Sequence, residues 1–199
     1  MVDNSAKESE ALAGKAGENS TITIRIPPPS HADDASLTQT LADVVNAVYK
    51  EAEHDIFLPS YQRTSPEEVA GFIRKGQLAV AYLTSTDEPV GCVAIKLLSS
   101  DRGQFGMFAL DAKLQGGGLG KQMALFAQDE CRRRGCTTMQ LELLVPTTVQ
   151  HLGKERMQAW YTRLGYGLVK LGSFEEDYPD LAKILAGPTE YRIFEKSLV

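Results

Sequence analysis

A glycine-rich segment between a predicted strand and a predicted helix is the feature of this sequence best suited to chemistry. Four of the five residues at 116–120 are glycine. The apolar run 104–110 before them predicts a strand. Leu119, Met123 and Phe126 share one face of a helix that begins at once. Glycines allow sharp turns and close backbone approach, and the free N–H groups at a helix start attract anions. The sequence therefore predicts a phosphate-binding turn here.

The spacing of the glycines argues against two common nucleotide-binding loops. A Walker loop needs glycine five residues before Gly120, where Gln115 stands, and Ser or Thr after Lys121, where Gln122 stands. The dinucleotide fingerprint Gly-x-Gly-x-x-Gly fails in each register, because Lys121 or Met123 occupies the last glycine position. A tight turn without a ligand is the alternative for a glycine cluster taken by itself.

Two motifs of the chain resemble the GNAT superfamily of N-acetyltransferases, which bind acetyl-CoA. Gln115, Gly118 and Gly120 form the Gln-x-x-Gly-x-Gly pattern of the family's pyrophosphate loop, after a hydrophobic-small-hydrophobic strand at 108–111. Residues 159–166 resemble the family's helix-ending signature, a Tyr followed four residues later by Gly and an aromatic residue. The resemblance covers residues 21–197, although its specific motifs are confined to 108–121 and 159–166.

The resemblance implies how acetyl-CoA, the cosubstrate, would be held. Backbone N–H groups from Gly116 to Lys121 would cradle the pyrophosphate, and the main chain of Leu110 would pair with the pantetheine arm like an added strand. The cofactor-binding residues implied are Phe108, Ala109, Leu110, Gln115, Gly116, Gly117, Gly118, Leu119, Gly120 and Lys121. No metal is expected.

The resemblance also implies three catalytic roles. The backbone N–H of Phe108 would face the thioester carbonyl, where one preorganised donor is worth roughly 10²–10³ in rate. Tyr161 would protonate the leaving thiolate. The base is left open between Glu142, which interrupts an apolar strand, a chain of water molecules and an acid in the acceptor loops.

Three positions depart from the family's pattern. Gln104 stands where some members carry a catalytic Glu, and an amide cannot accept the proton. Gly117 stands where Arg or Lys is frequent, and Lys154 stands where Asn is frequent, seven residues before Tyr161. None of these changes removes the backbone cradle.

The acceptor is expected between residues 54–64 and 173–189, the two segments that grip it in the superfamily. Phe57 and Tyr61 lie in the first segment, and Glu175 and Glu176 lie beside aromatic residues in the second. Acids beside aromatic rings favour a cationic amine through field and cation–π contact, although a solvated loop has the same composition. The predicted acceptor is the primary amine of a small molecule or an amino acid. The alternatives are a protein lysine or N-terminus.

The order of elements must position these residues. Apolar periodicity and turn residues predict strands at 21–26, 78–84, 90–98, 104–110, 138–145, 168–171 and 191–196. Helices are expected from a cap at Ser36, from a cap at Ser65 to Gly76, from the glycine loop to Arg134, and over about 154–164. This order predicts an α/β fold of the α+β kind. By resemblance it is a single GNAT domain over 21–199, with a mixed, mostly antiparallel sheet flanked by helices. The polar residues 1–20 predict a flexible arm.

Composition limits the class of protein further. The chain carries 21 Lys and Arg against 26 Asp and Glu, a net charge of −5, which argues against nucleic-acid binding as its main affinity. No stretch approaches the length of a membrane span, and no signal-peptide pattern opens the chain, so a cytoplasmic location is expected, with the nucleus not excluded. The three Cys and three His residues lack zinc-ligand spacing. A homodimer is suggested only by family analogy.

Two classes of protein besides an enzyme fit parts of this pattern. An acyl-CoA sensor without turnover would explain Gln104, whereas Tyr161 favours a catalyst. An inert interaction domain would bind no ligand at the glycine loop.

Overall fold

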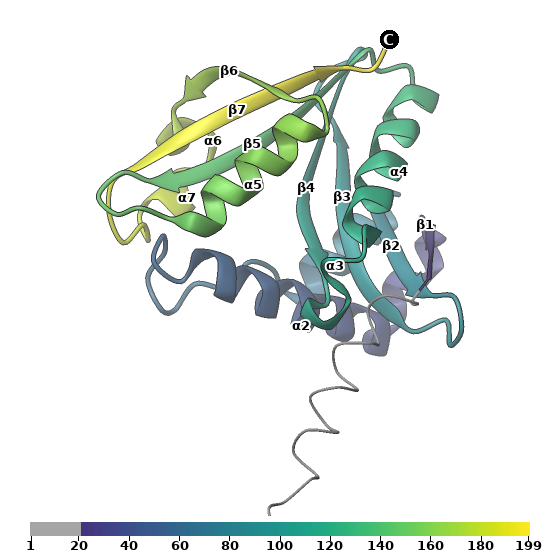
Figure 1. Cartoon of the computed structure of the whole chain (residues 1–199). Coiled ribbons are helices and arrows are strands. Elements are labelled where there is room, and N and C mark those ends of the chain that lie inside the picture. The colour runs from purple at the N-terminus through teal and green to yellow at the C-terminus, as the bar shows by residue number, and fades with distance from the viewer. Residues whose placement is uncertain (1–20) are drawn as a thin grey trace, which may run out of the picture.

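The computed structural model of the chain describes residues 21–199, and the flexible arm expected over residues 1–20 lies outside them. Figure 1 shows one sheet with helices packed on both of its faces. The strands are β1 (Ile22–Arg25), β2 (Leu78–Leu83), β3 (Pro89–Leu97), β4 (Arg102–Leu110), β5 (Thr138–Pro146), β6 (Gly167–Gly172) and β7 (Thr189–Ser197). The α-helices are α2 (Ala35–Glu53), α3 (Pro66–Arg74), α4 (Leu119–Arg133), α5 (Leu152–Arg163), α6 (Phe174–Asp177) and α7 (Pro179–Ala182), and η1 (Pro29–Asp33) and η2 (Ala112–Leu114) are 3₁₀-helices.

The seven strands form a single sheet in the order β1-β2-β3-β4-β5-β7-β6. Every neighbouring pair is antiparallel except β4 and β5, which are parallel. Leu41, Val45 and Ile73 of α2 and α3 pack on one face of the sheet, and Ala127 of α4 and Tyr161 of α5 pack on the other. The predicted class, a mixed and mostly antiparallel sheet flanked by helices, is confirmed.

The parallel pair β4 and β5 is short. Its register covers only 102–104 against 138–140, after which β4 continues beside β3 and β5 continues beside β7. Figure 1 shows the two strands adjacent near the C-terminus and spreading apart toward α2. Beyond Gln104, the edge of β4 that faces β5 therefore carries no partner strand within residues 21–199.

Local signals account for most boundaries, with two corrections. Ser65 caps α3 as predicted, because its Oγ accepts from the Glu68 N–H at 3.2 Å. The cap of α2 is Asp34 rather than Ser36: Asp34 Oδ1 accepts from the N–H groups of Ser36 and Leu37, each at 3.0 Å. A carboxylate satisfies two of the unpaired amides of the first turn. The segment 173–189, expected as a loop, contains the short helices α6 and α7.

No helix among the described residues is both long enough and apolar enough to cross a membrane.

Candidate active site

The glycine loop leaves a row of backbone N–H groups free. Gly116 and Gly118 have φ values of 89° and 81°, in the region that favours glycine, and Gly118 is the residue before α4. The N–H groups of residues 116–120 donate to no acceptor within residues 21–199. Five consecutive free amides at the positive end of a helix dipole form a site for an anion.

Neighbouring groups hold this loop in place. Gln115 donates its side-chain amide to the carbonyl oxygen of Leu110 at 3.0 Å, which ties the loop back to the end of β4. The Lys121 N–H, included in the cradle by resemblance, donates to the Gly118 carbonyl oxygen at 3.0 Å. The free amides of the cradle therefore end at Gly120.

A bulge in β4 turns the Phe108 amide out of the sheet. Met107 has a φ of 45°, and the register between β3 and β4 shifts at this point. The Phe108 N–H donates to the hydroxyl oxygen of Tyr49, on α2, at 3.2 Å. A bulge releases a strand amide from its ladder and re-aims it, so this amide is available to an oxygen outside the sheet.

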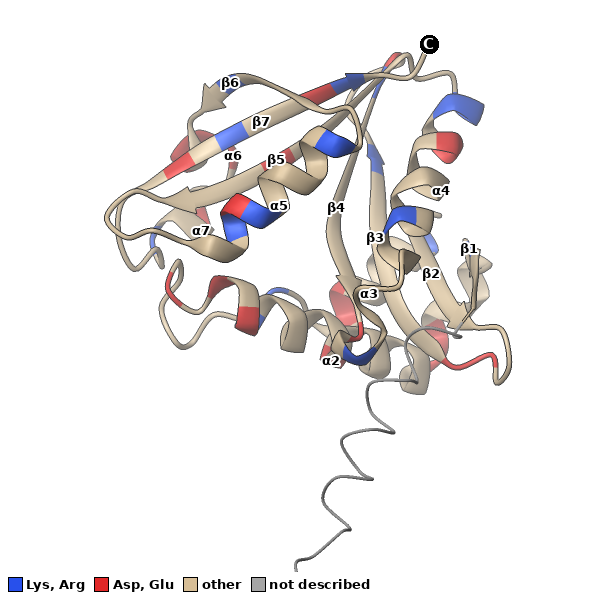
Figure 2. Cartoon of the chain, in the orientation of Figure 1, with Lys and Arg blue, Asp and Glu red and all other residues tan. Residues whose placement is uncertain are grey.

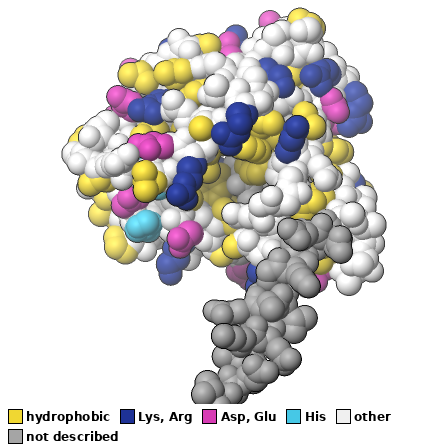
Figure 3. Space-filling view, viewed as in Figure 1, with side chains coloured by type: hydrophobic (Ala, Val, Ile, Leu, Met, Phe, Trp, Pro, Cys, Tyr) yellow, Lys and Arg dark blue, Asp and Glu magenta, His cyan; other side chains and the backbone are white. Residues whose placement is uncertain are grey.

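The loop, the bulge and α5 meet at the Phe108 ring. This ring lies 5.7 Å from the Trp160 ring, centroid to centroid. A Cβ placed on Gly120 would lie 3.8 Å from the Phe108 ring and 4.0 Å from Trp160. Figure 3 shows hydrophobic side chains lining a hollow in the middle of this face, with Lys and Arg side chains on its rim.

Tyr161 lies among aromatic rings on α5. It is 6% exposed, and its ring lies 6.2 Å from Phe194 and 6.3 Å from Phe105. Burial, followed by the negative charge of Tyr49 when ionised, raises the pKa of Tyr161 far above its ordinary value of 10. The phenol is therefore neutral at physiological pH and retains a proton to donate.

Glu142 lies on the opposite face of β5. Leu141 and Leu143 pack in the cluster that contains Tyr161, and Leu144 packs with Tyr191 in another. Because side chains alternate along a strand, Glu142 shares the face of Leu144.

Three groups hold the Glu142 carboxylate. Oε1 accepts from the side-chain amides of Gln104 at 2.5 Å and Gln140 at 3.3 Å, and Oε2 accepts from the Tyr178 hydroxyl at 2.6 Å. Gln104, the residue that departs from the family pattern, thus orients a carboxylate supplied by the neighbouring strand. The structure does not bring Glu142 and Tyr161 into contact on one face.

The structure brings the two predicted acceptor segments together. The Leu58 N–H donates to the Ile184 carbonyl oxygen at 2.9 Å, and the Phe57 ring stacks on Tyr61 with centroids 4.1 Å apart. The same ring lies 6.3 Å from Phe174 of α6. Phe57 is buried and Tyr61 partly buried, whereas Glu175 and Glu176 are exposed on α6. The two acids therefore face solvent rather than the aromatic cluster.

Three side chains near this site carry no signal in the sequence, namely Tyr49, Glu53 and Arg63, and neither does the pairing of Lys154 with Glu53. Lys154 is buried and its Nζ lies 2.8 Å from Glu53 Oε1, so the residue at the family's frequent Asn position joins α5 to α2. Figure 2 shows acidic positions at the end of α2 near basic positions at the start of α5. Tyr49 follows Val45 by four residues and so reads as a core position. No sequence signal separates it from the core.

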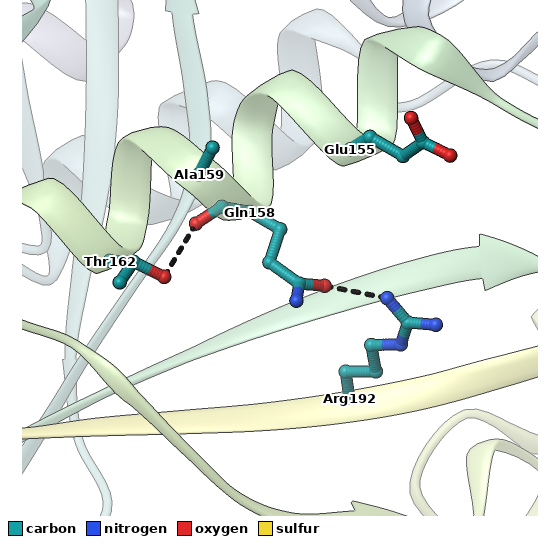
Figure 4. A pocket seen from close by; sticks show the side chains of 5 residues that line it. All are labelled: Glu155, Gln158, Ala159, Thr162 and Arg192. Carbon is teal, nitrogen blue, oxygen red and sulfur yellow. Dashed lines mark hydrogen bonds between the residues drawn. The ribbon is translucent and has the colours of Figure 1, made fainter.

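An open depression beside α5 is separate from these groups. It is lined by Glu155, Gln158, Ala159, Thr162 and Arg192 (Figure 4). Arg192 donates to the Gln158 side-chain oxygen at 2.5 Å and also pairs with Glu190, so its guanidinium is already engaged. Within residues 21–199 no group of three or more His, Cys, Asp or Glu side chains is placed to hold a metal ion.

Comparison with known proteins assigns the part of the chain that contains the glycine loop, the β4 bulge and α5 to one family. The family model described as "Acetyltransferase (GNAT) family" matches residues 45–166. None of the curated proteins compared with the chain matches it.

Several solved structures share the fold. The aminoglycoside 6′-N-acetyltransferase from Enterococcus faecium has a TM-score of 0.64 and 14% identity, covering 89% of this chain and 97% of that chain. PaiA N-acetyltransferase from Thermoplasma acidophilum, in complex with coenzyme A, has a TM-score of 0.63 and 15% identity, covering 89% and 99%.

A longer enzyme contains the fold as one part. The N-acetylglutamate synthase from Neisseria gonorrhoeae, complexed with coenzyme A and N-acetyl-glutamate, has a TM-score of 0.59 and 18% identity. The match covers 90% of this chain and 35% of that chain, so this chain spans about a third of the synthase's length.

The family match covers more than half of the 199 residues and includes the glycine loop, the β4 bulge and the aromatic end of α5. The chain therefore belongs to the GNAT family of acetyltransferases, the class of enzyme that its motifs predicted.

Proposed function

We propose that this protein transfers the acetyl group of acetyl-CoA to the primary amine of a small molecule or an amino acid, by direct attack within a ternary complex. The observation that carries the proposal is the row of free N–H groups at residues 116–120, which ends at the first turn of α4. A diphosphate matches such a row in both charge and hydrogen-bonding capacity.

The residues around the loop fit the rest of acetyl-CoA. The edge of β4 beyond Gln104 has no partner strand among the described residues, so it can hydrogen-bond an extended amide-containing arm. The Phe108 amide lies at the bulge of the same strand, where it can hold the thioester carbonyl oxygen. When bound, acetyl-CoA supplies the acetyl group as a thioester.

The proton transfers are assigned to groups of this chain. Glu142, positioned by Gln104 and Tyr178, accepts a proton from the acceptor ammonium, directly or through water, and leaves a neutral nitrogen able to attack. The Phe108 amide stabilises the charge that develops on the carbonyl oxygen. Tyr161 then donates its proton to the thiolate that leaves, since burial raises the pKa of this phenol and keeps it protonated. The nitrogen releases its second proton as the amide forms, and that proton returns through solvent to the Tyr161 phenolate.

The names of two structural relatives agree with a small acceptor. One is an aminoglycoside 6′-N-acetyltransferase and another is an N-acetylglutamate synthase with bound N-acetyl-glutamate, and at 14% and 18% identity their likeness to this chain is one of fold. A carboxylate held at Glu142 supports a catalyst over the sensor without turnover, because it supplies the base that Gln104 lacks.

The proposal is tested by titrating the purified protein with acetyl-CoA, with NAD as the control ligand, by calorimetry and thermal melting. Gly118→Asp places a negative charge in the cradle at a positive φ, so acetyl-CoA should bind at least about tenfold more weakly. Gly187→Asp is the matched control, since Gly187 is a loop glycine in open space without a positive φ.

Thiol release during a screen of amines, amino acids and peptides then separates the alternatives. Turnover with peptides alone would favour the protein acetyltransferase. Binding of acetyl-CoA with no turnover would favour the sensor. If millimolar acetyl-CoA leaves the melting temperature unchanged, both the transferase and the sensor are refuted.

A further inference from the structure

Arg63 stands apart from the other partly buried arginines of residues 21–199. Those others each form an ion pair: Arg25 with Asp87, Arg102 with Glu195, Arg134 with Glu130 and Arg192 with Glu190. Arg63 is partly buried as well, yet it forms no ion pair within the described part of the chain.

The two carboxylates whose negative charge acts on Arg63, those of Glu53 and Glu68, already have other partners. Glu53 pairs with Lys154 at 2.8 Å, and Glu68 Oε2 accepts from the Thr64 hydroxyl at 2.8 Å. Burial acts to lower the pKa of Arg63, and the negative charges around it, led by those of Tyr49 and Tyr61 if ionised, outweigh that effect and raise it. Both phenols are neutral at physiological pH because burial raises their pKa values, so neither supplies an anion there.

Arg63 is placed beside the reaction centre. Its guanidinium carbon lies 5.1 Å from the centre of the Tyr49 ring, and the hydroxyl of that ring accepts from the Phe108 amide at 3.2 Å. One tyrosine ring therefore separates the guanidinium from the amide proposed to hold the thioester. Arg63 also lies within the segment 54–64 that packs against residues 173–189.

A second group on this side of the sheet lacks a partner. The Tyr191 hydroxyl is buried and makes no hydrogen bond to any described residue, while its ring lies 6.0 Å from that of Tyr178. Tyr178 links the two ends of the region: it donates to Glu142, and the charge of Arg63 acts to lower its pKa. A positive group without an ion pair and a buried hydroxyl without a partner, within residues 21–199, thus both lie in the neighbourhood of Tyr178.

Resting on the proposed function, we infer that the acceptor is an amino acid, and that Arg63 binds its carboxylate while its amine is directed to Glu142 and the Phe108 amide. A guanidinium offers parallel N–H groups that match the two oxygens of a carboxylate. A zwitterion brings one charge of each sign, and the region presents a free cation at Arg63 and a carboxylate at Glu142. An amine without a carboxylate would leave the arginine unpaired.

The test measures the KM and kcat of amino acids and of the amines made by removing their carboxylate. Phenylalanine is paired with phenethylamine and methionine with 3-(methylthio)propylamine, and ω-amino acids are included as further acceptors. The wild type should acetylate at least one amino acid with a KM lower than that of its matched amine. Arg63→Gln should raise the KM for that amino acid by about 10- to 100-fold, as expected for a lost charge-assisted pair. The kcat for that amino acid, the KM for acetyl-CoA and the KM for the matched amine should change little.

Two further variants keep the result interpretable. Arg63→Lys retains the charge but not the paired N–H groups, so its KM should fall between those of the wild type and Arg63→Gln. Arg74→Gln removes an exposed arginine on the same side of the sheet and should leave all constants unchanged. Equal acetylation of amino acids and matched amines by the wild type, or an equal KM change for both in Arg63→Gln, would overturn the carboxylate site.

A binding measurement separates this inference from the proposed function. Calorimetry of every amino acid in the kinetic test into the protein saturated with free CoA requires no turnover. Amino-acid binding that Arg63→Gln weakens supports the site. If CoA binds and no amino acid does, the inference is overturned and the proposed function stands. If neither acetyl-CoA nor CoA binds, both are overturned.

Discussion

At the scale of residues, Tyr49 connects the parts of the proposed reaction centre. Its hydroxyl oxygen accepts from the Phe108 amide at 3.2 Å, and its ring faces the Arg63 guanidinium. Without such an acceptor, the amide released by the β4 bulge would be costly in a buried setting. On the proposed function, the thioester oxygen takes the place of the Tyr49 hydroxyl or shares the amide with it.

Tyr161 has a function that substitution can isolate. Tyr161→Phe removes only the hydroxyl, so kcat should fall by about 10²–10⁴-fold while the affinity for acetyl-CoA stays within about twofold. Steady-state kinetics and calorimetry check the two parts. Tyr82→Phe, on β2 beneath Arg25, is the matched control and should retain its kcat. A Tyr161→Phe enzyme with unchanged kcat would remove Tyr161 from the mechanism.

The pH dependence of kcat reports the same phenol. Burial raises the pKa of Tyr161 above its ordinary value of 10, so the acid stays protonated where a free tyrosine would ionise. As the pH rises, kcat should therefore increase while the base and amine lose their protons. It should then stay level to about pH 10, the ordinary tyrosine value, without a falling limb. A pH–rate profile of kcat measures this, and a decline beginning near pH 8 would contradict the assignment.

At the scale of elements, the end of α2 is joined to the start of α5 on the side where β4 and β5 have already spread apart. The buried pair of Glu53 and Lys154 links them, and His151 Nε2 lies 3.2 Å from both the Ala52 carbonyl oxygen and Asp55 Oδ1. α2 carries Tyr49 and α5 carries Tyr161, so the relative position of the two helices determines the distance between these hydroxyls.

The buried pair should make a measurable contribution to stability. Lys154→Met leaves the Glu53 carboxylate, whose side chain is 10% exposed, without its cation. The free energy of unfolding should fall by about 3–5 kcal/mol, the range for one partner removed from a buried pair. Glu53→Leu combined with Lys154→Met should recover part of that loss, because no buried charge remains.

Denaturant unfolding followed by circular dichroism measures these changes. Lys183→Ala removes one member of an exposed pair with Asp180 and is the control, with no measurable change expected. Equal stability of Lys154→Met and the wild type would show that the buried pair does not stabilise the contact between α2 and α5.

At the scale of the whole molecule, the site lies where the two halves of the sheet separate. β1 to β4 carry the glycine loop and the Phe108 bulge, whereas β5, β6 and β7 carry Glu142 and pack against Tyr161. A ligand bound along β4 would contact groups from both halves of the sheet. It would also lie close to α2 and to the start of α5. Binding should therefore stabilise residues 21–199 as a unit.

Acetyl-CoA at 100 times its Kd should raise the free energy of unfolding by about 2.7 kcal/mol. Amide hydrogen exchange gives the location: the N–H groups of residues 116–120 donate to no acceptor within the described chain, so they should exchange rapidly without ligand and slowly with it. Residues 84–88, in the turn between β2 and β3, provide an internal reference that should not change. Stabilisation without protection of 116–120 would move the binding site elsewhere.

The sequence by itself determined those parts of the protein that depend on neighbours along the chain. The strands, the start of α3 at Ser65 and the order of elements follow from period-two or helical patterns, caps and breakers, which act over a few residues. The glycine loop is a local motif for the same reason, and its pattern indicated the family that the comparison with known proteins shows. The sequence predicts the cap of α2 two residues late, at Ser36, because Asp34 and Ser36 are both good capping residues.

Only the tertiary structure decided which distant residues meet. Tyr49 and Lys154 occupy helical positions with the same spacing that core residues have. In the structure, the Tyr49 hydroxyl accepts a hydrogen bond from the Phe108 amide at the β4 bulge, and Lys154 pairs with Glu53. Gln104 could be seen to lack a carboxylate, but its contact with Glu142 depends on the short parallel pairing of β4 with β5. Arg63 is distinguished only by a comparison of ion pairs in space. Residues brought together by sheet register and helix packing are far apart in the sequence. Such contacts produce no local pattern of spacing, because the residues between the partners do not fix how far apart the partners lie in space.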